Sequence, residues 1–157
     1  MRNYGLVTAA HCVKEASEVE VYHPSKPANK FKARVLKTCR YRDLALLDHA
    51  ISDTEYFEVV RSAHVVARGD QLTAIGYPGY GPGDSVNARV GTVSSLAVKS
   101  GVAMIEVTQT LTSGMSGGPL LYGDEGVVGV IHKGGPEEDR NFAIDIKVLK
   151  AWLEEEP

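Results

Sequence analysis

The chain has 157 residues and a formal net charge of −3, with 17 Lys and Arg against 20 Asp and Glu. This length suffices for one compact domain or two small fused barrels. Because the charge is nearly balanced and no apolar run could span a bilayer, we expect neither nucleic acid nor a membrane as a partner.

The first chemically interesting segment is an apolar run at residues 6–12 that ends in His11 and Cys12. Taken alone, this pattern is typical of the end of a strand with a buried core histidine. Imidazole is also the side chain best suited to act as a general base near neutral pH, so His11 is a candidate catalytic residue once other residues of a site accompany it.

Alternating apolar and polar residues then predict two short strands, at residues 19–23 and around Phe31, Ala33 and Val35. Two prolines between them predict a loop. Asp43 immediately precedes the apolar run of residues 44–47. Alone it would be a solvated loop carboxylate, but its place at the mouth of a buried strand lets it reach a neighbouring imidazole.

The second half of the chain reads as strands separated by turns. The strands are expected at residues 71–77, 88–99, 102–109, 118–122, 127–132 and 141–146. Turns are predicted at Ser100-Gly101 and at residues 123–126, and a surface loop at residues 77–84. The last segment, from Lys147 to about Glu155, has the apolar spacing of a helix that packs on the barrels. A boundary between two barrels is expected between Val60 and Gly69.

Glycines surround Ser116, with Gly114 before it and Gly117-Gly118 after it. Residues without a Cβ permit a tight turn in which the backbone N–H groups of Gly114 and Ser116 point at one spot. Such a pair can stabilise the oxyanion formed in acyl transfer. A glycine-rich turn with an incidental serine is the alternative for this segment taken alone.

The three segments together suggest nucleophilic catalysis. A serine hydroxyl is a poor nucleophile at neutral pH and needs an adjacent base, which a carboxylate must hold in the correct tautomer. His11, Asp43 and Ser116 supply these groups in the chain order His, Asp, Ser. That order is one of the few known for serine-protease triads.

These segments resemble the trypsin-like superfamily of serine proteases. The similarity is closest to its HtrA/Deg-type, glutamyl-endopeptidase-like and viral branches. It extends to residues 42–48, 69–78, 91–96, 114–120, 126–131 and 141–144. The resemblance implies an all-β fold of two antiparallel six-stranded β-barrels, with a C-terminal helix at residues 147–155. Residues 1–68 would form the first barrel and residues 69–157 the second. Relatives carry strands before the histidine segment, so we expect the first barrel to be truncated at its N-terminus.

The resemblance also implies residue roles. His11, Asp43 and Ser116 would form the triad and Gly114 and Ser116 the oxyanion hole, with no metal or organic cofactor. Trypsin-like zymogens carry an aspartate just before the serine, where this chain has Met115. Other contacts must therefore order the oxyanion loop.

Two further residues are implied to bind substrate. Thr110 would lie at the base of the primary specificity pocket, where it offers no counter-charge for Arg or Lys. Aligned on the glycines, His132 matches a histidine that reads Glu or Gln, whereas the alignment on Ser116 leaves it one residue late. In the second register, His132 supports the triad or faces away, and the pocket takes small aliphatic side chains.

We therefore expect a serine endopeptidase acting on a peptide or protein substrate. A non-catalytic protease-like module that binds peptides or partners, and a viral polyprotein-processing protease, are the alternatives. Cys12 and Cys39 are the only cysteines. We expect two free buried thiols rather than a disulfide, a pattern that favours an intracellular or virally encoded protein.

Overall fold

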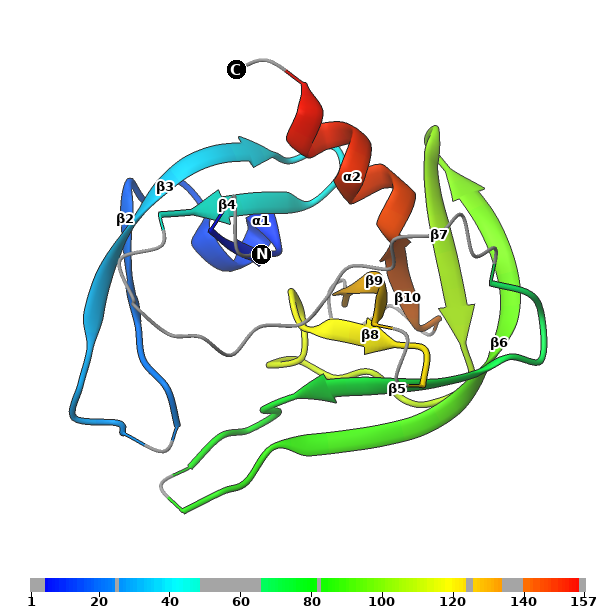
Figure 1. The fold of residues 1–157 in the computed structure, drawn as a ribbon, viewed down its shortest axis with the longest axis horizontal. Coiled ribbons are helices and arrows are strands. Elements are labelled where there is room, and N and C mark those ends of the chain that lie inside the picture. Colours follow the sequence, from blue (N-terminus) through cyan, green and yellow to red (C-terminus); the bar gives the residue numbers. More distant parts are fainter. Residues whose placement is uncertain are drawn as a thin grey trace.

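The computed structural model describes residues 5–24, 26–48, 66–81, 83–123, 126–133 and 140–155. Its strands form a four-stranded sheet from the N-terminal part of the chain and a closed six-stranded barrel from the rest (Figure 1). The fold is all-β with a C-terminal helix, as the sequence predicts.

The N-terminal sheet carries its strands in the order β1-β4-β3-β2. They are β1 (Leu6–Thr8), β2 (Glu18–Val21), β3 (Phe31–Cys39) and β4 (Leu44–Leu47). Neighbouring strands are antiparallel. All four residues of β4 are buried, because this strand lies between β1 and β3. A one-turn helix, α1 (Ala10–Val13), follows β1 and packs Val13 against Ala33 and Leu47.

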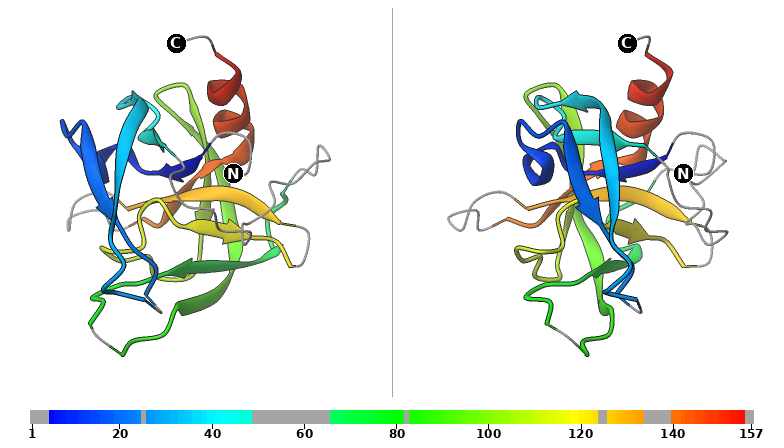
Figure 2. Two further views of the ribbon diagram at one scale, coloured as in Figure 1. Left: turned by 60° about the vertical axis from the view of Figure 1, so that its left-hand side comes forward. Right: turned by 90° about the vertical axis from the view of Figure 1, so that its left-hand side faces the viewer.

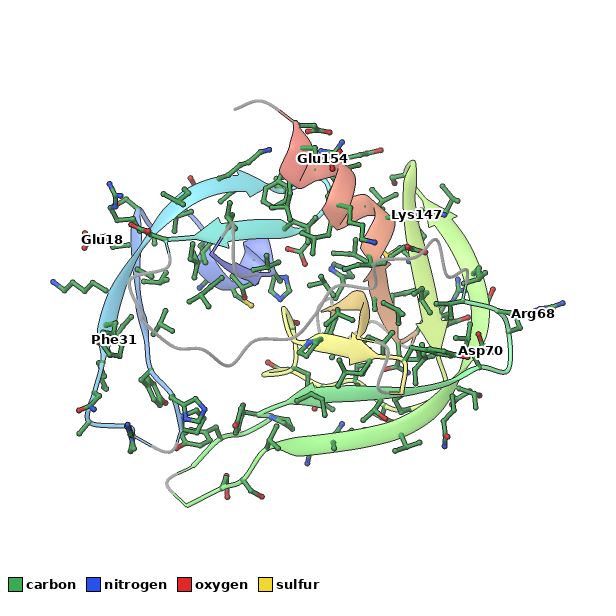
Figure 3. All side chains as sticks on the ribbon, in the orientation of Figure 1. Glu18, Phe31, Arg68, Asp70, Lys147 and Glu154 are labelled. Atoms are coloured by element: carbon green, nitrogen blue, oxygen red, sulfur yellow. The ribbon has the colours of Figure 1, made fainter. Side chains whose placement is uncertain are left out.

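The barrel closes in the order β10-β7-β6-β5-β8-β9. Its strands are β5 (Gln71–Gly76), β6 (Asn87–Lys99), β7 (Val102–Val107), β8 (Pro119–Leu121), β9 (Val127–His132) and β10 (Phe142–Asp145). Apolar side chains fill its interior, whereas Arg68 projects from the rim and Glu18 from the N-terminal sheet (Figure 3). The β6–β7 turn has positive φ at both Ser100 (51°) and Gly101 (79°), as a type I′ hairpin turn requires.

Helix α2 (Ile146–Glu154) covers the joint between the two sheets (Figures 1 and 2). It begins at Asp145, whose side chain accepts a hydrogen bond from the Lys147 N–H at 2.9 Å. This contact satisfies one of the free N–H groups at a helix start. The apolar face of the helix is buried with Leu44 of β4 and with Val130 of β9.

Two basic side chains of the N-terminal sheet hold the far end of α2. Lys37 Nζ donates to the carbonyl oxygens of Trp152 at 2.6 Å and Glu155 at 2.9 Å. The Trp152 carbonyl also accepts the Glu155 N–H at 3.2 Å, so Lys37 adds a charged donor to the carbonyl groups at the helix end. Arg42 forms two hydrogen bonds with the Glu155 carboxylate, at 2.7 and 3.0 Å. Helix α2 is thus attached to both sheets.

The predicted strands and the predicted helix are confirmed, with bounds that differ by a few residues. The sequence pattern did not predict α1, because one helical turn is too short to show a period. The thiols are free, as expected, but the expectation that both are buried is wrong: Cys12 is exposed and Cys39 half-buried. Cys12 lies on α1, whose buried residues are Ala10 and Val13.

The predicted barrel boundary between Val60 and Gly69 lies largely outside the described residues, so the division at residues 68 and 69 stays a prediction. Among the described residues, no helix is long and apolar enough to cross a membrane.

Trp152 offers a test of how much α2 stabilises the fold. Its side chain is 1% exposed and is shared by the core between the two sheets. We expect Trp152→Ala to lower the free energy of unfolding by about 3–5 kcal/mol, because it removes a large buried side chain. Val98→Ala, at a residue that is 73% exposed, is the control and should change it by less than about 0.5 kcal/mol. Urea unfolding measures the free energy of unfolding of both variants. Equal effects of the two substitutions would contradict the stabilising role assigned to Trp152.

Candidate functional site

Asp43 sits in an unusual backbone conformation just before β4. Its φ is 54°, in the left-handed region, and its N–H closes a turn onto the Arg40 carbonyl at 3.2 Å. Aspartate tolerates this region better than most residues. The turn allows both the main chain and the side chain of Asp43 to reach α1.

Asp43 supplies the hydrogen-bond acceptors for the start of α1. The first N–H groups of a helix have no partner within it, and Ala9, which precedes α1, offers no side-chain acceptor. The Ala10 N–H donates to the Asp43 carbonyl at 3.1 Å, and the His11 N–H donates to Asp43 Oδ1 at 2.8 Å. The position of α1, and so of His11, depends on this one residue.

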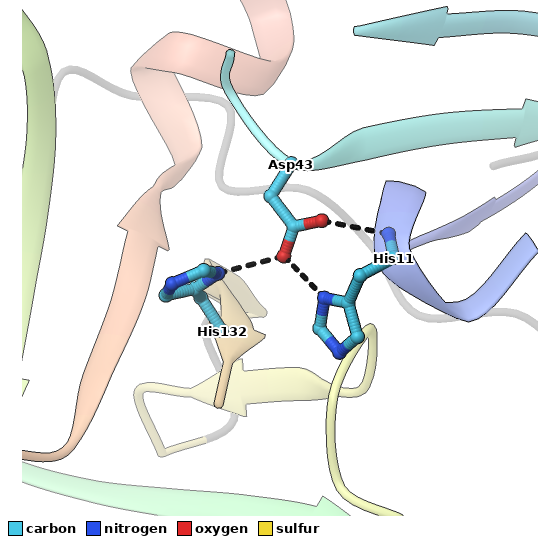
Figure 4. A group of neighbouring side chains, drawn as sticks. All are labelled: His11, Asp43 and His132. Carbon is cyan, nitrogen blue, oxygen red and sulfur yellow. Dashed lines mark hydrogen bonds and ion pairs between the residues drawn. The ribbon is translucent and has the colours of Figure 1, made fainter. Parts of the chain in front are cut away.

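The His11 ring binds the same carboxylate. Its Nδ1 lies 2.7 Å from Asp43 Oδ2 (Figure 4). An ionised carboxylate only accepts hydrogen bonds, so Nδ1 carries a proton, and in the neutral ring Nε2 presents the lone pair. The His11 side chain is 45% exposed, whereas that of Asp43 is 11% exposed. The structure therefore pairs two of the residues that the sequence proposed for a triad.

His132, the last residue of β9, approaches Asp43 from the barrel. Its Nδ1 lies 2.6 Å from Asp43 Oδ2, the oxygen that His11 also uses (Figure 4). The two imidazole rings meet edge to face, with centroids 6.1 Å apart. This contact agrees with the second of the two registers considered for His132, in which it supports the triad. Ile131 is fully buried in the barrel core, and neighbouring residues of a strand face opposite sides.

The pKa of the Asp43 carboxyl is lowered from its ordinary value. Burial acts to raise it, but three hydrogen bonds outweigh this effect. The His132 ring, the His11 backbone N–H and the His11 ring all donate to the ionised form, and the positive charge of a protonated His11 favours it further. Asp43 is therefore a carboxylate over the pH range in which histidine acts as a base.

The segment before Ser116 forms a tight turn. The Met115 N–H donates to the Thr112 carbonyl at 3.1 Å, and Gly114 at the third position has a φ of 94°. A type II turn requires positive φ at this position. A Cβ on Gly114 would lie 2.9 Å from the Pro78 Cα, so both the conformation and the space select glycine.

The glycines after Ser116 allow the barrel to touch the N-terminal sheet. A Cβ on Gly117 would lie 2.4 Å from Thr8 Oγ1 and 2.7 Å from the Ala9 N. This close approach places the Ser116 turn directly against the residues that lead into α1. The Cys12 Sγ adds a contact of 3.8 Å to the Ser116 carbonyl.

The Ser116 hydroxyl is bonded to the main chain of Lys133. Its Oγ accepts from the Lys133 N–H at 3.2 Å and donates to the Lys133 carbonyl at 3.3 Å. Within the described part of the chain it forms no hydrogen bond with His11. The structure thus brings Ser116 to the segment that carries His11 without joining the two side chains.

The two N–H groups proposed for an oxyanion hole are available. Within the described residues, neither the Gly114 N–H nor the Ser116 N–H has an acceptor, whereas the Met115, Gly117 and Gly118 N–H groups between and after them do. Among the residues that the structure describes, the turn thus leaves two of its N–H donors without an acceptor.

The turn is ordered by contacts that the sequence pattern did not reveal. Met115 is fully buried in the barrel core, where a Cβ on Gly76 would lie 3.0 Å from its Cα. Asn141 Oδ1 accepts from the Leu111 N–H at 2.8 Å.

Arg89 of β6 holds the same segment from another side. Its Nη1 donates to the Thr110 carbonyl at 2.7 Å and lies 3.4 Å from Thr112 Oγ1. Arg89 reads in the sequence as an ordinary strand residue, so only its position in the barrel indicates this function. Thr110 itself is exposed, and its predicted place at the base of a specificity pocket stays a prediction.

One group of side chains has the donor atoms for a metal ion. Among the described residues, His11, Asp43 and His132 present ligand atoms that all lie within 4.8 Å of one another. Their N···O distances of 2.6 and 2.7 Å are those of hydrogen bonds. Two ligands that each lie about 2.0–2.2 Å from one tetrahedral metal ion would be about 3.3–3.6 Å apart. Hydrogen bonding accounts for the arrangement.

Residues 1–130 match the family described as the trypsin-like peptidase domain. The uncharacterized protein y4bJ of Sinorhizobium fredii (strain NBRC 101917 / NGR234) is 32% identical over 129 residues, covering 80% of this chain and 20% of that protein.

Solved structures share the fold. The HtrA-type protease AlgW with decapeptide superposes with a TM-score of 0.79 at 20% identity, over 94% of this chain and 46% of that one. The serine endoprotease from Yersinia pestis superposes with a TM-score of 0.76 at 19% identity, over 94% and 52%. The chain thus spans about a fifth of its curated relative and about half of these proteases.

The lowered pKa of Asp43 predicts a pH dependence of stability. A carboxyl with a lowered pKa in the folded protein stabilises the fold above its unfolded pKa of about 3.9, and this contribution is lost as the pH falls through the folded pKa. We expect the difference in free energy of unfolding between wild type and Asp43→Asn to narrow below about pH 4. Urea unfolding at a series of pH values measures it.

Glu106 is the comparison for this experiment, because hydrogen bonding to Arg140 also lowers the pKa of its carboxyl. The difference in free energy of unfolding between wild type and Glu106→Gln should likewise narrow as the pH falls. A difference for Asp43→Asn that stays constant between neutral pH and pH 3 would contradict the assignment of an ionised, hydrogen-bonded Asp43.

Proposed function

Since the chain belongs to the trypsin-like peptidase family, we propose that it is a serine endopeptidase in which Ser116 is the nucleophile, His11 the general base and Asp43 the orienting carboxylate. The observation that carries this proposal is the 2.7 Å contact between His11 Nδ1 and Asp43 Oδ2. It sets the His11 tautomer that a serine nucleophile needs, next to the turn that carries Ser116.

Acylation starts with rotation of the Ser116 side chain. Its hydroxyl leaves the Lys133 main chain, to which it is bonded at 3.2 and 3.3 Å, and turns to His11 Nε2. His11 takes the hydroxyl proton while Oγ bonds to the carbonyl carbon of the scissile peptide. The carbonyl oxygen becomes an oxyanion, which the Gly114 and Ser116 N–H groups stabilise. Asp43 stabilises the positive charge on His11.

Collapse of this intermediate breaks the peptide C–N bond, and His11 gives its proton to the departing amine. The acyl group stays on Ser116 Oγ. A water molecule then attacks the ester carbon while His11 accepts its proton, and the same proton returns to Oγ as the carboxylic acid product leaves. The residues are restored without a metal or organic cofactor.

One observation favours a second function, a non-catalytic protease-like module that binds peptides. The Ser116 hydroxyl contacts Lys133 and not His11. A module of this kind would keep the fold and the turn without needing the serine and the imidazole to meet. Reaction with a fluorophosphonate separates the two functions, because only an activated serine is labelled.

We propose peptide or protein substrates, in keeping with the decapeptide and tripeptide named with the AlgW structures. The contact of His132 Nδ1 with Asp43 supports a primary pocket for small aliphatic side chains rather than for Glu or Gln. The Arg89 guanidinium, 2.7 Å from the Thr110 carbonyl, adds a positive charge that opposes Arg or Lys there.

Ser116→Ala tests the nucleophile. We expect peptide hydrolysis to fall by about 10⁶-fold and fluorophosphonate labelling to disappear, because triad members act as one unit. Circular dichroism and the unfolding midpoint should stay unchanged, since the substitution removes one partly buried hydroxyl. Ser94→Ala, at a serine of β6 outside the site, is the matched control and should retain both activities. Undiminished hydrolysis by purified Ser116→Ala would refute the proposal.

A peptide library tests the specificity. We expect cleavage after Val, Ala or Leu. We expect none after Arg or Lys, because the positive charge of Arg89 opposes theirs. Mass spectrometry of the cleavage products measures the preference for wild type and for His132→Asn, which should be the same. Dominant cleavage after Glu or Gln that is lost in His132→Asn would support the other register for His132.

A further inference from the structure

We propose that Arg89 is a positioning residue for peptide hydrolysis: its guanidinium reaches from the inner face of β6 to the segment that precedes Ser116 and fixes the start of the Ser116 turn. This inference rests on the proposed peptidase function. It deepens that function by adding a residue that lies outside the triad and outside the turn itself.

Arg89 lies on the face of β6 that looks into the barrel. Alternate residues of a strand share a face, and Val93, four residues further along, is 2% exposed within the barrel core. Val90, on the opposite face, is 59% exposed. Arg89 itself is half-buried. A guanidinium that leaves water in this way loses free energy unless its donors find acceptors, so the acceptors of Arg89 define what it does.

The acceptors lie mainly on the segment before Ser116. Arg89 Nη1 donates to the Thr110 carbonyl at 2.7 Å and lies 3.4 Å from Thr112 Oγ1. Arg89 Nε donates to Asn87 Oδ1 at 2.9 Å, which fixes the direction of the side chain at its base. These acceptors are neutral oxygens, so the contact is no ion pair. The charge of the guanidinium strengthens hydrogen bonds that hold one stretch of main chain against β6.

Gln109 closes the same contact in the reverse direction. Its Nε2 donates to the Arg89 carbonyl and to the Leu72 carbonyl, both at 3.2 Å. Gln109 is 8% exposed, and a Cβ on Gly91 would overlap its Oε1, so glycine at this position of β6 leaves room for the amide. The consecutive residues Gln109 and Thr110 are therefore bound to the main chain and to the side chain of Arg89. The segment is held to β6 at two adjacent points.

Thr112 connects Arg89 to the N–H groups proposed for the oxyanion. The Thr112 carbonyl accepts the Met115 N–H at 3.1 Å and closes the turn in which Gly114 has a φ of 94°. A displaced Thr112 would redirect the Gly114 N–H, and such donors must lie about 2.7–3.1 Å from the developing oxyanion. The side chains of Leu111 and Met115 are fully buried and fix the apolar side of the segment. Arg89 fixes its polar side.

Two substitutions separate the geometry of the guanidinium from its charge. Methionine is nearly as long but has no donor, and lysine keeps the charge without the rigid fork that holds Asn87 and Thr110 together. We expect Arg89→Met to lower kcat by about 10- to 100-fold, the range for a small displacement of catalytic groups. Arg89→Lys should lower it less without restoring it. The rate of fluorophosphonate labelling should fall in parallel, because the phosphonyl oxygen uses the same N–H donors as the oxyanion.

Amide hydrogen exchange measured by NMR gives a readout that does not need activity. The Met115 N–H closes the turn, so we expect it to exchange at least about tenfold faster in Arg89→Met than in the wild type, whereas the amides of β10 should exchange at the wild-type rate. Faster exchange of the Met115 N–H in a protein whose wild type is not labelled by fluorophosphonate would refute the peptidase but support the contact.

Arg34→Met is the matched control, because Arg34 of β3 is an arginine with a 69% exposed side chain that pairs with Asp48. It should leave kcat, the labelling rate and the exchange of the Met115 N–H unchanged. If Arg89→Met does not fold, Arg89→Lys and Arg89→Gln replace it.

The pH dependence of kcat/KM separates positioning from a long-range effect of charge. The apparent pKa that it gives for the general base should be the same in the wild type, Arg89→Met and Arg89→Lys. A pKa that shifts in Arg89→Met and returns in Arg89→Lys together with full kcat would show that Arg89 acts through its charge, and would overturn the proposal. So would wild-type kcat and labelling rate in folded Arg89→Met, even with a lowered unfolding midpoint, since the contact would then serve stability alone.

Discussion

The carboxylate of Asp43 is the interaction on which the site depends. It accepts the N–H of a helix start, the ring of His11 and the ring of His132, and these donors come from α1 and from the barrel strand β9. A buried carboxylate is costly unless such donors surround it. The contact therefore works in both directions: the donors keep Asp43 ionised, and Asp43 holds the N-terminal helix and the barrel strand β9 against each other. The left-handed backbone at Asp43 is the local strain that this arrangement requires.

The turn that carries Ser116 depends on a second constraint, the close approach of main chains. Gly114 permits the turn, and Gly117 lets it lie against Thr8 and Ala9, where no Cβ would fit. The residue before the serine is an apolar one, and Met115 is buried in the barrel core. Burial of this side chain thus orders the turn as part of the barrel core.

Helix α2 supports the segment that carries Asp43 from the side away from the two histidines. Helix α2 packs on both sheets, and Arg42, the residue next to Asp43, binds Glu155 at its end. Lys37 binds the last carbonyl groups of the helix. The segment that carries the aspartate is therefore held on one side by the donors of the site and on the other by the C-terminal helix. Because Arg42 is adjacent to Asp43, a displacement of α2 would also displace the Asp43 carboxylate.

The sequence by itself determined the strands, the final helix and the three segments that carry His11, Asp43 and Ser116. The period of the apolar residues and the spacing of the glycines are local properties of the sequence. Catalysis by a serine nucleophile requires a serine, a histidine and a carboxylate, so these residue types can be recognised in the sequence. Tertiary structure alone decided which face His132 presents, because a register differing by one residue turns a strand side chain to the opposite side. It also decided that Arg89 and Asn141 hold the segment that leads to the Ser116 turn and that the Ser116 hydroxyl binds Lys133. These contacts join residues that are distant in sequence, and their partners are set by the packing of one sheet on the other, which no local pattern records.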